Sequence, residues 1–135
     1  MLDLSAMLAE GRNAIARLAI RAPGPTTPAR ALSGGNQQKV LFAKWLGTRP
    51  RVFIMDEPTI GVDVGSKAEI RSIVRETAAE GVGVLLITAE IDELISLCDR
   101  VLVMFRGRIV ADFTGSAIER GTILHASVSG EPIAA

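Results

Sequence analysis

The sequence of 135 residues contains one cysteine, one tryptophan, one histidine and no tyrosine. The single cysteine, Cys98, excludes an intramolecular disulfide framework and fits a reducing compartment. Basic and acidic residues number fifteen each, so the formal net charge is zero. This balance argues against a strongly basic nucleic-acid surface and against a polybasic membrane anchor.

Long hydrophobic runs are also missing. No apolar stretch approaches the roughly 20 residues that a membrane-spanning helix needs. The first residues lack the basic region and apolar core of a signal peptide. Any association with a membrane is therefore expected to occur through a partner. What the chain does have is a globular composition, 48% hydrophobic, at a length suited to one domain.

The most informative stretch reads LSGGNQQKV, from Leu32 to Val40. Ser33, two glycines, three polar residues and an apolar run predict a helix that begins at Ser33 and ends near Leu46, with Gly47 as its stop. Glycines in a first turn lack Cβ atoms, so the backbone N–H groups can approach a ligand closely. Such a helix end is an anion site, most often for phosphate. The alternative is an ordinary serine-capped helix that follows a glycine turn.

The next landmark is the run RVFIMDEP at residues 51–58. Four apolar residues followed by Asp56, Glu57 and Pro58 predict a buried strand of a parallel sheet with acids at its C-terminal end. Open α/β sheets bind ligands at that end. An aspartate there can hold Mg²⁺ on a nucleotide, and the adjacent glutamate can orient and deprotonate an attacking water. A lone Asp-Glu pair would favour a solvated turn, but the glycine-rich helix upstream favours the functional interpretation.

The order and spacing of these motifs carry a family resemblance. LSGGNQQ, then VFIMDEP, then the run Thr59–Asp63 resemble the signature motif, Walker B element and D-loop of an ABC-type ATPase. LSGGNQQKV together with DEPTIGVDVGSK is similar to the second cassette of the tandem ATP-binding subunits of monosaccharide importers, of the ribose, xylose and galactose types. The close resemblance covers residues 30–113. It implies an α/β fold: part of a P-loop NTPase sheet with flanking helices.

The resemblance also implies a domain organisation. Residues 1–30 would be the end of the helical subdomain followed by a proline-rich loop. Residues 31–113 would be the signature, Walker B and D-loop part of the ATPase domain, and residues 114–135 a C-terminal helix and tail.

Hydrophobic patterning supplies the remaining elements. A helix is expected behind a capping box at Ser66–Glu69, with Ile70, Ile73, Val74 and Ala78 on its buried face. Trp45 is expected to pack inward, and Cys98 to behave as a small buried hydrophobe. The other expected elements are an amphipathic helix over 3–20, strands over 83–88 and 100–105, a helix over 90–97, an Arg106-Gly107 hairpin turn into a strand over 108–113, and a short helix over 116–125.

The signature motif has a defined role in the family that this chain resembles. In ABC ATPases two cassettes sandwich two ATP molecules, each lying between the Walker A loop of one cassette and the signature motif of the other. The resemblance implies that Ser33, Gly34 and Gly35 contact the γ-phosphate of an ATP held by a partner cassette, with Gln37 nearby.

The acids after the predicted strand would serve this cassette's own site. By the same resemblance, Asp56 would hold Mg²⁺ through water, and Glu57 would polarise the hydrolytic water. Asp63, in the D-loop, would couple the two sites across the interface.

The sequence departs from the family pattern first at the Walker A loop. No G-x-x-x-x-G-K-[ST] occurs, so we expect the chain to be the C-terminal part of a cassette that does not hold or hydrolyse ATP by itself. In the family's sheet the Walker A strand lies between the strands matching 83–88 and 101–105. Its absence predicts two apolar strand edges and a chain that is marginally stable or self-associates.

The second departure concerns the switch histidine. Family members that hydrolyse ATP well usually carry histidine where this chain has Ala89. An alanine cannot hydrogen-bond the γ-phosphate or the water. Second cassettes of sugar importers often lack this histidine. We therefore expect the site of Asp56 and Glu57 to be weak or inactive, and the site completed by Ser33–Gly35 to be the working one.

The resulting expectation is an ATP-binding and ATP-hydrolysing subunit that energises sugar import from the cytoplasmic face of the plasma membrane. The implied partners are an intact cassette, transmembrane permease subunits and, indirectly, a periplasmic or extracellular sugar-binding protein. One alternative is a soluble ABC ATPase acting on ribosomes or DNA, against which the neutral charge and the NQQ sequence count. The other is an inert remnant. The sequence does not indicate which sugar is transported.

Overall fold

The computed structural model describes residues 3–131, so the end of the expected C-terminal tail, residues 132–135, lies outside the described part. The chain divides into two compact units, one up to Leu85 and the other from Leu86 onward, and each is described by itself. Within the described residues no helix combines the length and the apolar character needed to cross a membrane.

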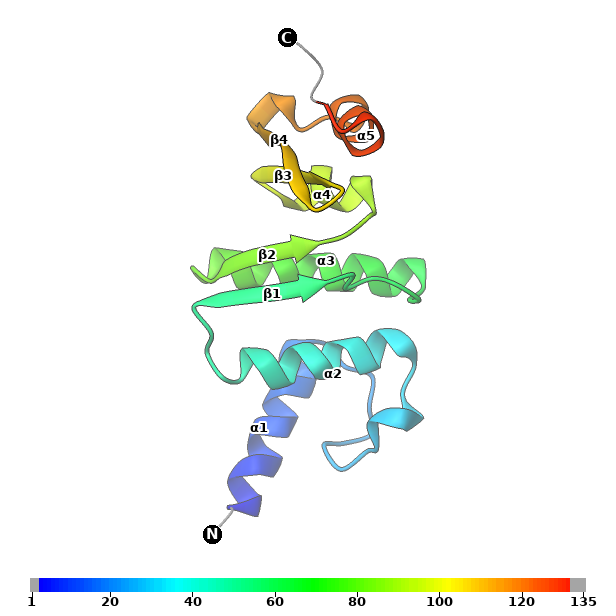
Figure 1. Cartoon of the computed structure of the whole chain (residues 1–135). Helices are drawn as coiled ribbons and strands as arrows, with labels where there is room; N and C mark the ends of the chain where they lie inside the picture. Colours follow the sequence, from blue (N-terminus) through cyan, green and yellow to red (C-terminus); the bar gives the residue numbers. More distant parts are fainter. Residues whose placement is uncertain (1–2, 132–135) are drawn as a thin grey trace. The chain divides into compact units, whose positions relative to one another are not determined.

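The first unit begins with two helices (Figure 1). Helix α1 (Leu4–Arg17) is shorter than the expected 3–20 and has none of its own residues buried. Its N-cap is Asp3, which accepts hydrogen bonds from two first-turn N–H groups. The apolar residues that anchor this segment, Leu18 and Ile20, lie just beyond the helix end. After the proline-rich loop and a short 3₁₀ turn (Ala29–Ala31), helix α2 (Gly34–Leu46) begins at Ser33 as predicted.

Strands β1 (Val52–Asp56) and β2 (Gly83–Ile87) form a two-stranded sheet, and β2 runs across the boundary between the units. Figure 1 shows the two strands running in the same direction, with helix α3 (Val64–Ala79) connecting them along the sheet. This is the expected strand–helix–strand arrangement.

Burial on only one face of β1 corrects the prediction of a fully buried strand. Phe53 and Met55 are buried, whereas Val52 and Ile54 are 61% and 60% exposed. The covered face packs on α2, where the rings of Phe42 and Phe53 meet edge to face at 5.8 Å. An unbroken apolar run does not indicate how many faces of a strand are covered.

Helix α3 begins earlier than the sequence predicted. Its N-cap is Asp63, and the expected cap Ser66 is the third residue of the helix. The Asp63 carboxylate accepts from the Ser66 N–H at 3.0 Å and from the Ser66 hydroxyl at 2.7 Å. Asp63 therefore caps the helix in place of Ser66, and it satisfies the Ser66 N–H that the predicted capping box would have paired with the Glu69 side chain.

The buried face of α3 is close to the predicted one. Ile70, Ile73 and Val74 are buried as expected, but Thr77 is buried where Ala78 was predicted, and Ala78 is exposed. The helix ends before Gly81, whose φ of 86° suits the left-handed residue that commonly follows a helix.

The second unit comprises helix α4 (Ile91–Leu97), strands β3 (Arg100–Phe105) and β4 (Arg108–Thr114), a 3₁₀ turn (Gly115–Ala117) and helix α5 (Arg120–Ser129). The antiparallel β3–β4 pair is the predicted hairpin. Arg106 and Gly107 both have positive φ, as a two-residue type I′ turn requires. The helix expected over 116–125 starts later, at Arg120. Among the described residues β2 and β3 belong to separate sheets, in agreement with the expected gap between strands 83–88 and 101–105.

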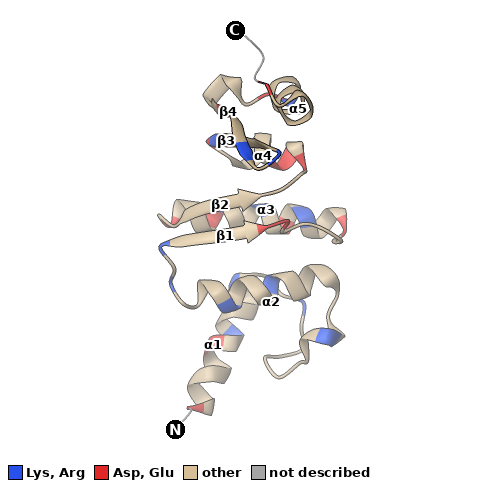
Figure 2. Ribbon diagram, in the orientation of Figure 1, with Lys and Arg blue, Asp and Glu red and all other residues tan. Residues whose placement is uncertain are grey.

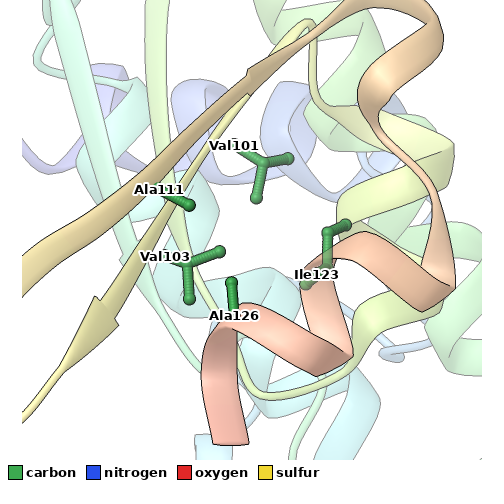
Figure 3. Close-up of a cluster of buried hydrophobic side chains, with 5 residues drawn as sticks. All are labelled: Val101, Val103, Ala111, Ile123 and Ala126. Atoms are coloured by element: carbon green, nitrogen blue, oxygen red, sulfur yellow. The ribbon is translucent and has the colours of Figure 1, made fainter. Parts of the chain in front are cut away.

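A small apolar cluster forms the interior of this unit (Figure 3). Cys98 packs against the cluster, and burial raises the pKa of its thiol. Cys98 therefore packs as a small hydrophobe, as predicted, but it is partly buried and not fully buried. The cluster consists of Val101, Val103, Ala111, Ile123 and Ala126.

Candidate functional site

The N-terminal end of α2 presents a serine hydroxyl and a first turn of backbone N–H groups. Ser33 is exposed, and its side chain does not bond the helix N–H groups that an N-cap serine usually satisfies. Instead, its Oγ accepts a hydrogen bond from the Nδ2 of Asn36 at 2.8 Å. The first bond of the helix runs from the Gln37 N–H to the Ser33 carbonyl at 2.9 Å. Within the described residues, the first-turn N–H groups therefore have no side-chain cap and can donate to a bound anion.

The two glycines of this turn have different surroundings. Gly34 is exposed, and a Cβ there would lie 3.7 Å from the Gly61 carbonyl oxygen, an ordinary contact. Gly35 is buried, and a Cβ there would lie 2.2 Å from the Ser66 hydroxyl oxygen of α3. Close approach of a ligand was the expected reason for both glycines. At Gly35 the reason visible in the structure is the close approach of α2 to α3.

Gln37 lies on the same exposed end of the helix. Its Nε2 donates to the Leu32 carbonyl at 2.8 Å, which holds the side chain back over the segment that precedes the helix. Ser33, Gly34 and Gln37 are thus brought together at the surface, while Gly35 lies beneath them.

A buried lysine lies one turn further along α2. Lys39 is 1% exposed, and its Nζ donates to the Ala19 carbonyl at 2.6 Å and to the Glu69 carboxylate at 2.9 Å. Arg21 reaches the other carboxylate oxygen of Glu69 at 3.1 Å. The hydrogen bond from Lys39, with the nearby positive charges, lowers the pKa of Glu69.

This network was not predicted, although the sequence contains a signal for it. Gly35, Lys39 and Phe42 follow one another at helical spacings of four and three residues, so they share one face of α2. Phe42 marks that face as buried, and the burial of Lys39 follows from the spacing. The burial of Lys39 was not predicted because its side chain is polar.

The acids after β1 lie at the end of the strand, where Figure 2 shows acidic residues in red. Asp56 is exposed, whereas Glu57 is half-buried and has a φ of 46°, a left-handed conformation that is uncommon for a residue other than glycine. Asp56 also lines a cavity of about 110 Å³ between α2 and β1, together with Gln38 and Pro58.

Two predicted site residues remain, Asp63 and Ala89. Asp63 is the N-cap of α3, and its hydrogen bonds from the hydroxyl and N–H of Ser66 lower the pKa of its carboxyl group. Ala89 belongs to the other unit, where it is exposed in the connection between β2 and α4.

The inward packing predicted for Trp45 is wrong. The residue is 49% exposed, and the Lys44 ammonium group lies 5.2 Å from its ring centroid. The ring lines a cavity of about 200 Å³ with Val52 and Ile54, on the side of β1 that the described residues leave exposed. Phe42, one turn earlier, occupies the interior position on α2.

Comparison with known families matches residues 6–60 to the ABC transporter family, and this range covers most of α1 and the whole of α2 and β1. The fold agrees with that match. A solved structure described as MJ1267, an ATP-binding cassette of an ABC transporter, superimposes with a TM-score of 0.80 at 27% identity, over 96% of this chain and 51% of that one. The chain is therefore similar to the ATPases of ABC transporters in part of its sequence and in its fold. Its fold is that of an ABC ATPase cassette, about half of which it covers.

Curated relatives of this chain have names that refer to sugar import. Ribose import ATP-binding protein RbsA 2 of Burkholderia pseudomallei strain 1710b is 53% identical over 114 residues, which make up 84% of this chain and 22% of the relative. Ribose import ATP-binding protein RbsA of Shouchella clausii strain KSM-K16 is 44% identical over 117 residues, 87% of this chain and 23% of the relative. The chain therefore spans less than a quarter of the length of these relatives.

Proposed function

We propose that this chain acts in an ABC-type sugar importer, and that the tip of α2 completes an ATP site whose other half belongs to a second cassette. The observation that carries the proposal is the exposed Ser33 hydroxyl beside first-turn N–H groups without a side-chain cap. The family match and the sugar-import names of the relatives support the choice of ligand and of process.

The chemistry of the tip suits a terminal phosphate. Backbone N–H groups and the positive end of the helix dipole stabilise an anion there. The Ser33 hydroxyl adds a directed donor, and the exposed Gly34 allows close approach without a side chain in the way. Gln37 borders the same surface. Gly35 contributes its backbone N–H, while its missing side chain allows α2 to pack against Ser66.

Asp56 and Glu57 would serve the chain's own half-site. Mg²⁺ usually takes one or two carboxylates and completes its shell with water and phosphate oxygens, and the exposed Asp56 carboxylate fits that donor set. When bound, Mg²⁺ neutralises phosphate charge. Glu57, next to Asp56, would orient the attacking water.

The proposed setting follows from the relatives. Their names specify ribose import, so we propose a sugar importer whose permease subunits bring this chain to the cytoplasmic face of the membrane, with a sugar-binding protein as an indirect partner. Residues 1–30 would end the helical subdomain, residues 31–113 would form the ATPase part, and residues 114–135 would follow it.

The test combines this chain with an intact ABC cassette whose own signature serine has been replaced. That cassette can bind Mg-ATP but depends on another chain to complete its site. Adding this chain should raise its ATPase rate, and Ser33→Arg should abolish the stimulation because the long cationic side chain blocks the tip. Ser127→Arg, the same substitution at an exposed residue of α5, is the matched control and should leave the stimulation unchanged. Absence of stimulation by the unmodified chain would identify it as an inert remnant.

A further inference from the structure

Asn36 uses both ends of its side-chain amide at the tip of α2. It is 8% exposed. Its Oδ1 accepts from the Arg21 backbone N–H at 2.8 Å, and its Nδ2 donates to the Ser33 Oγ at 2.8 Å. A backbone N–H can only donate, so the group facing Arg21 must be the amide oxygen. The amide nitrogen then necessarily faces Ser33.

This arrangement determines what the Ser33 hydroxyl can do. A hydroxyl has one hydrogen to donate and lone pairs that accept. Because the Ser33 Oγ accepts from Asn36, the hydroxyl hydrogen is not directed at Asn36, and it remains available on the exposed side of the residue. A donor is the group that a phosphate oxygen needs.

The acceptor side of Asn36 is itself held in place. The segment that carries the Arg21 N–H is anchored by buried Leu18 and Ile20, and Lys39 donates to the Ala19 carbonyl from the same helix that carries Asn36. Two hydrogen bonds thus link the segment after α1 to α2. In both of them the partner on α2 is a buried side chain, Asn36 as acceptor and Lys39 as donor. The rotamer of Asn36 is fixed within the first unit before any nucleotide arrives.

We propose that Asn36 is a positioning residue: its amide sets the Ser33 hydroxyl as a hydrogen-bond donor toward the terminal phosphate of ATP. The inference rests on the proposed function, because it needs Ser33 to meet a phosphate. It adds a requirement for the fifth residue of the LSGGN motif, namely a side chain that donates to the serine while accepting from the backbone behind it.

Asn36→Asp tests this requirement with almost no change of shape. The aspartate keeps an oxygen for the Arg21 N–H but replaces the donor to Ser33 with an acceptor, so the Ser33 hydroxyl turns its hydrogen inward. In the stimulation assay, Asn36→Asp and Ser33→Ala should each lower the rate about tenfold, the size of one lost hydrogen bond to a charged group. The double variant should be no worse than either single variant, because both changes remove the same donor.

Two outcomes would separate failure of the inference from failure of the proposed function. The first outcome is that Ser33→Ala impairs stimulation and that Asn36→Asp lowers it by the same factor whether residue 33 is serine or alanine. Asn36→Asp then acts through the charge it adds or through folding, and the inference is overturned. The proposed function is overturned if the unmodified chain fails to raise the ATPase rate of the cassette. It is also overturned if the Ser33→Arg variant raises that rate as much as an unmodified chain that does stimulate. Thermal unfolding of each variant reports its folding, and Asn36→Ala replaces Asn36→Asp in the same cycle if the aspartate variant does not fold.

Discussion

Both units of this chain bury apolar side chains, but they differ in the polar groups that they bury: among the described residues of the second unit, the buried polar side chain is Glu93 of α4. The unit up to Leu85 buries the amide of Asn36 and the ammonium group of Lys39 beneath the tip of α2, and it also buries Thr59 and Thr77. The unit from Leu86 onward packs a small apolar cluster between a hairpin and α5 (Figure 3). Of the predicted site residues, only Ala89 falls in the second unit.

The first unit buries polar side chains that hold other residues in position, at a cost in stability that apolar side chains would avoid. A buried polar group costs free energy unless its hydrogen bonds are made, and an apolar side chain of similar size carries no such risk. In the first unit the buried polar groups hold the elements around Ser33 in a fixed relation. The second unit packs an apolar cluster beside its hairpin, and its buried charged residue, Glu93, lies on α4 and outside that cluster. Substitutions in each unit test this comparison.

The largest effect should come from the apolar cluster. Ile123→Ala removes a side chain that is 3% exposed, and the lost burial plus the cavity should lower the free energy of unfolding by about 4 kcal/mol. Its neighbour Leu124 is 49% exposed, so Leu124→Ala should change stability by less than about 0.5 kcal/mol. Hydrogen exchange measured on peptides from residues 86–131 reads this unit separately. Equal effects of the two substitutions would contradict the description of the cluster.

Removing the partner of the buried lysine should cost nearly as much in the first unit. Glu69→Gln leaves the Lys39 ammonium group without its carboxylate, and we expect a loss of about 3 kcal/mol. Glu76→Gln is the matched control, because Glu76 lies on the exposed side of the same helix and its carboxylate accepts a hydrogen bond from Ser72. Denaturant unfolding monitored through exchange in residues 3–85 measures both. If Glu69→Gln costs no more than Glu76→Gln, the polar interior has no positioning role.

Alanine substitutions at the two glycines of the α2 tip should have different effects on stability. Gly35→Ala would place a methyl group 2.2 Å from the Ser66 hydroxyl oxygen, and forcing α2 and α3 apart should cost about 2 kcal/mol. Gly34→Ala meets only an ordinary contact and should leave stability within about 0.5 kcal/mol. Thermal unfolding compares them. Ser66→Gly should restore part of the stability of Gly35→Ala, and failure to do so would contradict the assigned contact.

The smallest effect is expected from acid. Hydrogen bonds from Ser66 lower the pKa of Asp63 below its ordinary value of 3.8, so the folded chain binds that proton less readily than the unfolded chain. This contribution to stability is present above the ordinary pKa and is lost as the pH falls through the lowered one. Asp63→Asn should therefore reduce the loss of stability of the first unit on acidification from about pH 5 to about pH 3. Asp112→Asn should do the same in the second unit, where Arg100 lowers the pKa of Asp112.

Local patterns were enough to place most of the helices and strands. Ser33 begins α2, Gly81 follows α3, and Arg106-Gly107 turns the hairpin, because each depends on a few neighbouring residues. The start of α3 was predicted wrongly because Asp63 and Ser66 are both suitable N-cap residues, and only the fold selects the aspartate.

The details of the candidate site depended on contacts that are distant in the sequence. Gly35 meets Ser66, Lys39 meets Glu69, and Asn36 meets Arg21, and local sequence does not reveal which helix approaches which. The motif indicated which residues gather at the tip of α2, but it did not indicate what holds them there. Trp45 was misplaced for the same reason, because its exposure depends on which face of β1 is covered.

The backbone at Glu57 carries a consequence of its own. Left-handed φ angles disfavour a glutamate by roughly 1–2 kcal/mol, whereas asparagine tolerates them better. Random mutagenesis followed by selection for heat resistance alone should therefore enrich asparagine at this position. The enriched variants would have less backbone strain but would lack the carboxylate that the proposed chemistry requires. Selection for heat resistance would therefore remove Glu57, whereas selection for ATP hydrolysis would retain it.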